Sequence, residues 1–252
     1  MGIDFGNDEE LIAGDSYNER GYHENKDLSY LGEEILIALG GDHMRPPFLE
    51  PGWETFSLLD SFRAKAKLLV ETKFRKSHAW GWKDPRTSLL LPFWRQIFQP
   101  THYIITIRNP LAVAESLLRR NGIAIRHGSE LWFLHMASAI FHTRGFKRKF
   151  IFFENASQSP RQFDRELAEF LSIDDAASGA AVGPEFADTL VHHKQTDEQV
   201  YANDDIHSLA KVLYRELCEL HFLERNEPNT LSASPRKDEN LLIFKMVETE
   251  PS

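Results

Sequence analysis

The sequence predicts an α/β protein in which helices cover a parallel sheet. Segments of helical and of strand-like character alternate along the 252 residues, as they do where parallel strands are joined by helices. With 42% hydrophobic residues, the chain is also long enough to bury one sizeable core. We therefore expect a single α/β domain over residues 1–226. A polar linker and a tail with a candidate edge strand are expected at 227–252.

The N-terminal part of the chain begins with an acidic, turn-rich segment and continues with helical patterns. Residues 1–24 are weakly periodic, whereas the apolar spacing over 27–39 predicts a helix that stops at Gly40-Gly41. The next expected elements are a helix at 54–74, a short strand at 80–83 and a helix at 86–98.

The clearest strand covers residues 101–107, which are rich in β-branched and aromatic side chains. It ends at Arg108-Asn109-Pro110. Because Asn is a good N-cap and Pro a good first helical residue, we expect a helix over 111–120 that starts immediately after the strand. The remaining expected elements are a helix at 129–146, a strand at 149–153, a helix at 159–171, a loop at 176–184 and a helix at 204–223.

Charge and composition exclude several classes of protein. A formal net charge of −9 argues against a nucleic-acid binder, because such proteins neutralise phosphates with a basic surface. The sequence has no run approaching the roughly 18 to 20 apolar residues that a membrane span needs, so we expect no membrane insertion. The single Cys218 lies in an apolar-patterned helix, which favours core packing over a reactive thiol. Because one cysteine cannot form an internal disulfide, we expect a reducing, cytoplasmic setting.

The strand, turn and helix around Arg108 predict an anion site. An arginine at the carboxyl end of a parallel strand projects toward the crevice where open α/β sheets bind ligands, and it lies beside the positive end of the next helix. Ser116 lies nearly two turns along that helix, where its hydroxyl could meet the phosphate that Arg108 binds. The alternative is that Arg108 pairs with a surface carboxylate and that Ser116 has no ligand.

These residues resemble the 3′-phosphate motif of sulfotransferases that use 3′-phosphoadenosine 5′-phosphosulfate (PAPS). The match covers Arg108, Asn109, Pro110 and Ser116. Other segments follow the order found in this superfamily, and the resemblance runs from about residue 2 to 223. These segments are 21–25 (Gly-Tyr-His-Glu-Asn), 82–87 (Trp-Lys-Asp-Pro-Arg-Thr), 152–155 (Phe-Phe-Glu-Asn) with Ser159-Pro160, and 186–193 with its paired histidines.

The resemblance implies a fold, a reaction and a co-substrate. The fold is a three-layer parallel sheet of the P-loop NTPase type. The reaction is transfer of a sulfuryl group from PAPS to a hydroxyl or amine of a carbohydrate or small molecule, without a metal. The acceptor and the oligomeric state are not specified by the motifs.

The sequence departs from the family pattern in two places. No strand is followed by a Gly/Ser/Thr-rich loop with a basic residue, which normally holds the 5′-phosphosulfate. The resemblance aligns the start of this sequence with the segment after that loop, so we expect the first strand, loop and helix to be missing. Phe153 lies at a position where members of the family often have a tyrosine, so the hydroxyl is absent there. A non-catalytic binding or scaffold protein therefore remains an alternative, and a P-loop kinase relative is disfavoured because the Gly-x4-Gly-Lys loop is missing.

The resemblance suggests Glu24 as the base that deprotonates the acceptor, with His23 as a neighbour that could replace it. Lys83 or Arg86 would assist the sulfonate or the substrate. Each role has a structural alternative, in which Glu24 pairs with Lys83 or Arg86, and Asp84 forms a clasp with Arg86.

The remaining histidines give weaker indications. His192-His193 would contact substrate or a cofactor lid rather than a metal, because adjacent extended residues point to opposite sides. The alternative is that both histidines are simply exposed to solvent. His135 and His142 are interpreted as core or boundary residues.

Overall fold

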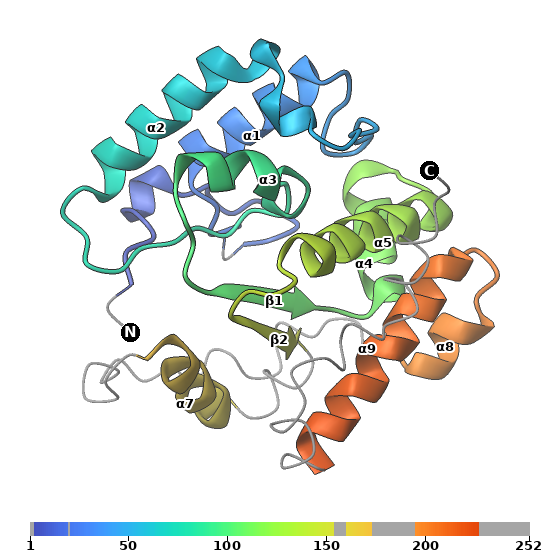
Figure 1. The fold of residues 1–252 in the computed structure, drawn as a ribbon. Helices are drawn as coiled ribbons and strands as arrows, with labels where there is room; N and C mark the ends of the chain where they lie inside the picture. The colour runs from blue at the N-terminus through green and yellow to red at the C-terminus, as the bar shows by residue number, and fades with distance from the viewer. Residues whose placement is uncertain (1–2, 20, 154–159, 173–194, 227–252) are drawn as a thin grey trace. The chain divides into compact units, whose positions relative to one another are not determined.

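The structure is a computed structural model that describes residues 3–19, 21–153, 160–172 and 195–226 (Figure 1). The chain divides into two compact units. Unit 1 comprises Met1–Ile105, His142–Ile151 and Asn155–Leu190, and unit 2 comprises Thr106–Phe141, Phe152–Glu154 and Val191–Ser252. The predictions for 154–159, for the loop at 176–184, for His192-His193 and for 227–252 lie outside the described residues.

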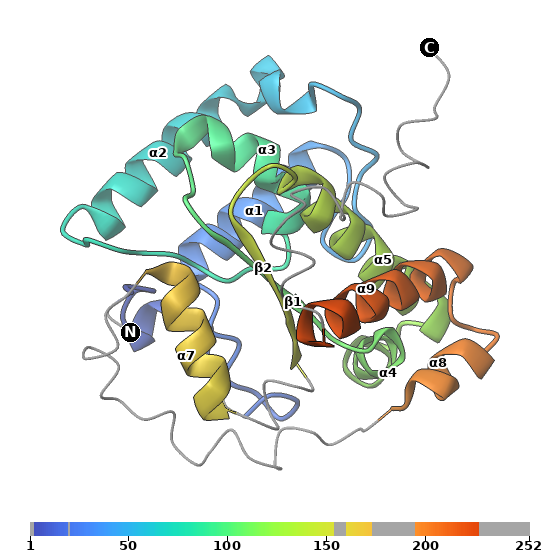
Figure 2. The ribbon, with the colours of Figure 1, turned by 60° about the horizontal axis from the view of Figure 1, so that its bottom comes forward.

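The described residues form a mostly helical α/β structure with a small parallel sheet. Strands β1 (Tyr103–Ile107) and β2 (Arg148–Phe152) lie side by side and pair with each other (Figure 2). Along β1, Tyr103, Ile105 and Ile107 are buried, whereas Ile104 and Thr106 are exposed. The coarse α/β class is therefore confirmed. The described part of β1 has one buried face, however, and a central strand of a three-layer sheet is buried on both, so the three-layer arrangement stays a prediction.

Three helices form the core of unit 1. They are α1 (Lys26–Ala38), α2 (Asp60–Phe74) and α3 (Thr87–Ile97). Fully buried leucine and isoleucine side chains of α1 pack against apolar residues of α2 and α3. The sequence predicted α1 and α3 to within a residue at each end. The predicted helix at 54–74 is divided instead, because the short 3-10 turns Trp53–Thr55 and Ser57–Leu59 precede α2.

The strand predicted at 80–83 is wrong in extent. Only Trp80 pairs, as an isolated parallel bridge with Asp4. Asp4 N donates to the Ala79 carbonyl at 2.9 Å, and Gly81 N donates to the Asp4 carbonyl at 3.0 Å. Gly6, at φ +91°, then turns the N-terminal segment in a conformation that favours glycine. A strand needs a partner along its length, and residues 80–83 have one at a single position within the described chain.

Unit 2 contains most of the remaining helices. They are α4 (Pro110–Asn121), α5 (Ile125–His142), α8 (Asp197–Ala202) and α9 (Ser208–Asn226), and α7 (Pro160–Leu171) belongs to unit 1. Helix α4 contacts α8 and α9. It also lies close to α5, since a Cβ added at Gly128 would come within 2.9 Å of the Ala114 Cα. A larger side chain at Gly128 would therefore push α4 and α5 apart.

Several helix boundaries in the second half differ from the predictions. Helix α5 starts four residues before the predicted 129–146 and ends at His142, and Gly145 at φ +77° follows it. Helix α9 starts at Ser208 rather than at 204, and α8 was not predicted. No helix in the described ranges is both long and apolar enough to cross a lipid bilayer.

Candidate functional site

The turn between β1 and α4 is built by local interactions. Asn109 is the N-cap of α4, and its side-chain oxygen accepts hydrogen bonds from Leu111 N at 3.0 Å and Ala112 N at 3.2 Å. Pro110 is the first helical residue, so it leaves no unpaired N–H at that position. The predicted cap is confirmed. Because Asn109 already satisfies these amides, an anion bound here would depend on side chains rather than on the helix N–H groups.

Arg108 directly follows β1, and its backbone is fixed from α5. Its carbonyl accepts a hydrogen bond from Trp132 Nε1 at 3.0 Å, and Trp132 is 5% exposed. The guanidinium carbon lies 5.3 Å from the centroid of the Phe153 ring, a cation–π contact. The aromatic residue that replaces the expected tyrosine therefore contacts the arginine that the sequence singled out.

Ser116 lies within α4 and is half-buried. Its hydroxyl makes no hydrogen bond with any residue that the structure describes. Asn109 is held more firmly, because its Nδ2 donates to the Gln195 carbonyl at 3.2 Å, and Gln195 Nε2 donates to Glu115 Oε2 at 2.7 Å. Convergence of the Arg108 and Ser116 side chains on one phosphate stays a prediction.

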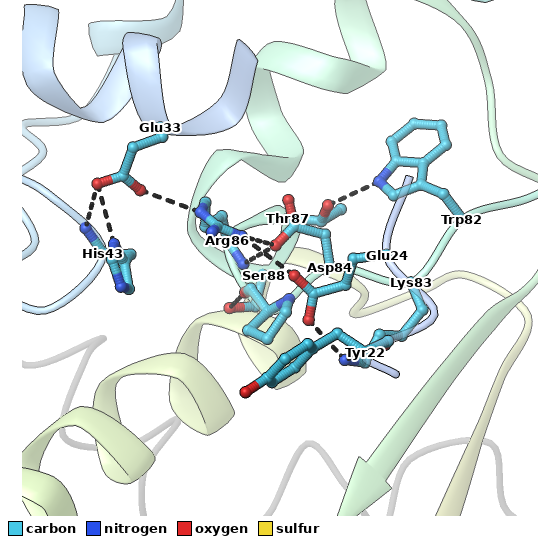
Figure 3. Close-up of polar contacts among 11 residues, drawn as sticks. Tyr22, Glu24, Glu33, His43, Trp82, Lys83, Asp84, Arg86, Thr87 and Ser88 are labelled. Atoms are coloured by element: carbon cyan, nitrogen blue, oxygen red, sulfur yellow. Dashed lines mark hydrogen bonds and ion pairs between the residues drawn. The ribbon is translucent and has the colours of Figure 1, made fainter. Parts of the chain in front are cut away.

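A second polar site lies in unit 1 (Figure 3). We call it the carboxylate–cation cluster. Its members are Glu24, Glu33, His43, Lys83, Asp84 and Arg86. They come from the segment before α1, from α1 itself, from the loop after it and from the segment that leads into α3.

Arg86 is at the centre of the carboxylate–cation cluster. Its Nη1 contacts Asp84 Oδ1 at 2.6 Å and Glu24 Oε2 at 3.4 Å, and its Nε donates to Glu33 Oε2 at 3.0 Å (Figure 3). Its backbone N–H also donates to Asp84 Oδ1 at 3.0 Å. One guanidinium therefore ties three carboxylates together, and the predicted Asp84–Arg86 clasp is present.

Glu24 is buried, with 7% of its surface exposed, and it forms ion pairs with two cations. Lys83 Nζ donates to Glu24 Oε1 at 2.6 Å and lies 3.2 Å from the Tyr22 carbonyl, and Arg86 provides the second contact. The Lys83 side chain is 56% exposed, so its displacement would open one Glu24 oxygen to solvent. This is the pairing described by the structural alternative, and the role of Glu24 as a base stays a prediction.

Burial and neighbouring charges shift the pKa values in the cluster. Burial raises the pKa of Asp84 to about 6, and Glu24 adds to this effect while Arg86 opposes it. Burial also raises the pKa of Glu33, but hydrogen bonds from His43 and Arg86 outweigh it and lower that pKa below its ordinary value. Although burial acts in the opposite direction, Asp84 and Glu33 raise the pKa of Arg86.

Glu33, Asp42 and His43 offer three ligand atoms that lie within 4.8 Å of one another. Each of these groups already has partners. His43 Nδ1 contacts Glu33 Oε1 at 2.9 Å, Arg86 occupies the other Glu33 oxygen, and Asp42 Oδ1 accepts from Met44 N and Arg45 N. Closure of the loop after α1 explains this group, so we assign no metal to it.

The predicted site residues fall into two groups. Glu24, Lys83 and Arg86 meet in unit 1, and Arg108 and Ser116 belong to one strand–turn–helix of unit 2. His23 is exposed at φ +53°. Sequence reasoning missed Glu33 and His43. No local signal could have found them, since Glu33 lies 53 residues from Arg86 in the sequence.

Comparison of the chain with protein-family models, with curated proteins and with solved structures found no match. The functional argument therefore depends on the residues and their geometry.

Proposed function

We propose that this protein is a PAPS-dependent sulfotransferase of the three-layer α/β type that the sequence resembles. It would transfer a sulfuryl group to a hydroxyl or amine of a carbohydrate or small molecule. The observation that carries the proposal is the β1–α4 turn. It combines an arginine directly after a strand, a capped helix that follows at once, and the Ser116 hydroxyl, which makes no hydrogen bond with a described residue. This is the pattern on which the resemblance rests.

The proposal assigns the 3′-phosphate of the nucleotide to Arg108 and Ser116. Arginine binds phosphate through two parallel N–H donors, and a hydroxyl adds one further bond. In a chain with a net charge of −9, a dianionic ligand must be met by a few placed cations. The cation–π contact with Phe153 would hold the guanidinium before the ligand arrives.

The carboxylate–cation cluster would supply the chemistry of transfer. The acceptor oxygen attacks sulfur, the bond between sulfur and the phosphate oxygen breaks, and 3′,5′-adenosine diphosphate leaves. The acceptor's proton goes to Glu24, and the ammonium of Lys83 or the guanidinium of Arg86 meets the negative charge that develops. Displacement of the exposed Lys83 side chain is the smallest change that would free a Glu24 oxygen for this role.

Nucleotide titration tests the proposal. Calorimetric titration with 3′,5′-adenosine diphosphate should show binding, and Arg108→Ala should weaken it by roughly 10- to 100-fold, because charge-assisted hydrogen bonds are lost. Adenosine 5′-monophosphate lacks the 3′-phosphate, so Arg108→Ala should leave its affinity unchanged. The matched control is Arg119→Ala, which removes an exposed cation from the last turn of α4.

A non-catalytic binding or scaffold protein is the second candidate. The observation that favours it is the mutual pairing of Glu24, Lys83 and Arg86, which is what a purely structural cluster requires. No binding of 3′,5′-adenosine diphosphate by the wild-type chain would favour this candidate. Binding that Arg108→Ala does not weaken would remove the assignment of the 3′-phosphate.

A further inference from the structure

One cation outside both sites has no opposite charge beside it among the residues that the structure describes. Arg95 lies in the last turn of α3, and it forms no ion pair with any described residue. Its guanidinium carbon lies 4.1 Å from the centroid of the Phe146 ring. Its Nε is buried and has no hydrogen-bond partner within the described ranges. Since a buried donor without a partner costs free energy, a group that supplies an acceptor here would be bound favourably.

A second unpartnered donor contacts the same phenylalanine. Tyr103, the first residue of β1, is 9% exposed, and its buried hydroxyl has no hydrogen-bond partner in the part of the chain that the structure describes. Its ring meets the Phe146 ring edge-on, with centroids 5.8 Å apart. Arg95 and Tyr103 therefore contact one side chain while both keep an unused donor.

The electrostatics of this region favour an anion. Burial raises the pKa of Tyr103, and the charge of Arg95 opposes that shift. Burial and Arg95 together lower the pKa of His142 to about 4, so this imidazole is neutral at pH 7. The adjoining segment 142–149 (His-Thr-Arg-Gly-Phe-Lys-Arg-Lys) contains four cations and no acid, although the whole chain is acidic. Of these cations, Lys149 pairs with Glu166 at 3.5 Å.

We propose that Arg95 and Tyr103 bind an oxyanion of a small molecule, a carboxylate or a phosphate group, beneath the ring of Phe146. The guanidinium provides charge and donors, and the phenol provides one further hydrogen bond. Phe146 is 38% exposed and follows Gly145, which has a positive φ, in a tight turn closed by the bond from Phe146 N to the Thr143 carbonyl at 3.1 Å. Movement of this exposed ring would open the guanidinium to solvent.

This site is separate from the proposed nucleotide site. Tyr103 is the first residue of β1, whereas Arg108 follows its last residue. The inference does not depend on sulfotransferase activity. It would stand if the chain bound no nucleotide.

Thermal unfolding of the whole chain in phosphate, acetate or chloride at equal ionic strength tests the proposal. A bound anion raises the midpoint by mass action, so phosphate or acetate should stabilise the wild type beyond chloride. A larger effect of phosphate would indicate a phosphate-bearing ligand, and a larger effect of acetate a carboxylate. Either outcome supports the site where the stabilisation persists in Arg108→Ala, because the proposed nucleotide site also binds phosphate.

Tyr103→Phe is the decisive variant because the hydroxyl that it removes has no hydrogen-bond partner among the described residues. Without anion its stability should equal or exceed that of the wild type. Its apparent Kd for the stabilising anion should be roughly tenfold higher, because one hydrogen bond to a charged group is lost. Arg95→Gln should abolish the stabilisation. Tyr30→Phe and Arg75→Gln, both at exposed positions, serve as matched controls.

Arg108→Ala separates the two sites, because it removes any phosphate bound at the proposed nucleotide site, and the stabilisation that remains in this variant belongs to Arg95 and Tyr103. Loss of all stabilisation in Arg108→Ala would overturn the proposal. The proposal is overturned if neither anion stabilises the wild type beyond chloride, as expected if only water fills the site. It is also overturned if Tyr103→Phe responds to the anion as the wild type does, a result that remains readable if Arg95→Gln fails to fold.

Discussion

In the carboxylate–cation cluster each charged side chain contacts an opposite charge or a hydrogen-bonding neighbour, whereas in the β1–α4 turn the Ser116 hydroxyl makes no hydrogen bond with a described residue. Both regions have the residue types that an active site needs. In the first, those residues are partners of one another, so their loss should change stability in addition to the proposed chemistry of transfer. In the second, the proposed ligand would be the partner of the Ser116 hydroxyl, so loss of that hydroxyl should mainly change binding. The predictions below test this contrast.

The largest effect is expected from Arg86→Met, which leaves Glu24, Glu33 and Asp84 without their shared cation. Removing one partner of a buried ionic network typically costs about 3 to 5 kcal/mol, and denaturant unfolding should show a loss of that size. Arg86→Lys keeps the charge but not the planar fork, so its loss should be smaller. Arg75→Met, at an exposed position, is the control. A loss below about 1 kcal/mol would contradict a structural role for the network.

The next effect concerns the pH dependence of stability. The pKa of Asp84 is about 6 in the folded chain and 3.8 ordinarily, so the folded state binds more protons between about pH 4 and pH 6. The contribution of Asp84 to the free energy of unfolding therefore falls as pH rises through this window and is constant above it. Asp84→Asn does not titrate. Its stability relative to wild type should rise by up to about 3 kcal/mol from pH 4 to pH 7.

Denaturant unfolding at a series of pH values measures this difference, and Asp8→Asn at an exposed position is the control. If the free energy of unfolding of Asp84→Asn relative to wild type stays constant across the window, burial does not raise the pKa of Asp84 as described.

The smallest effect on stability is expected in the β1–α4 turn. Ser116→Ala exchanges a helical serine for a better helix former, so the free energy of unfolding should stay within about 0.5 kcal/mol or rise. The Kd for 3′,5′-adenosine diphosphate should nevertheless increase roughly tenfold, because the phosphate loses a hydrogen bond. Calorimetry and denaturant unfolding measure the two quantities, with the exposed helical Ser61→Ala as control. Lower stability with unchanged affinity would reverse the contrast between the two regions.

Local features of the fold were predictable from the sequence. Asn109-Pro110 specified the start of α4, because the cap bonds span only two or three residues. Helix α8 could have been predicted from its capping box, in which Thr196 and Gln199 bond to each other's backbone. Its short length gave too little apolar periodicity to be noticed.

The sequence by itself determined the helices α1, α3 and α4 and the strands β1 and β2 to within two residues, because these elements depend on neighbours along the chain. The tertiary structure alone decided that Trp80 pairs at one position and that Arg86 joins Glu24, Glu33 and Asp84. It also decided that the Tyr103 hydroxyl is buried without a hydrogen-bond partner from any described residue. The physical reason is that strand pairing, ion pairing and burial join residues far apart in the sequence, and no local pattern records which of them meet.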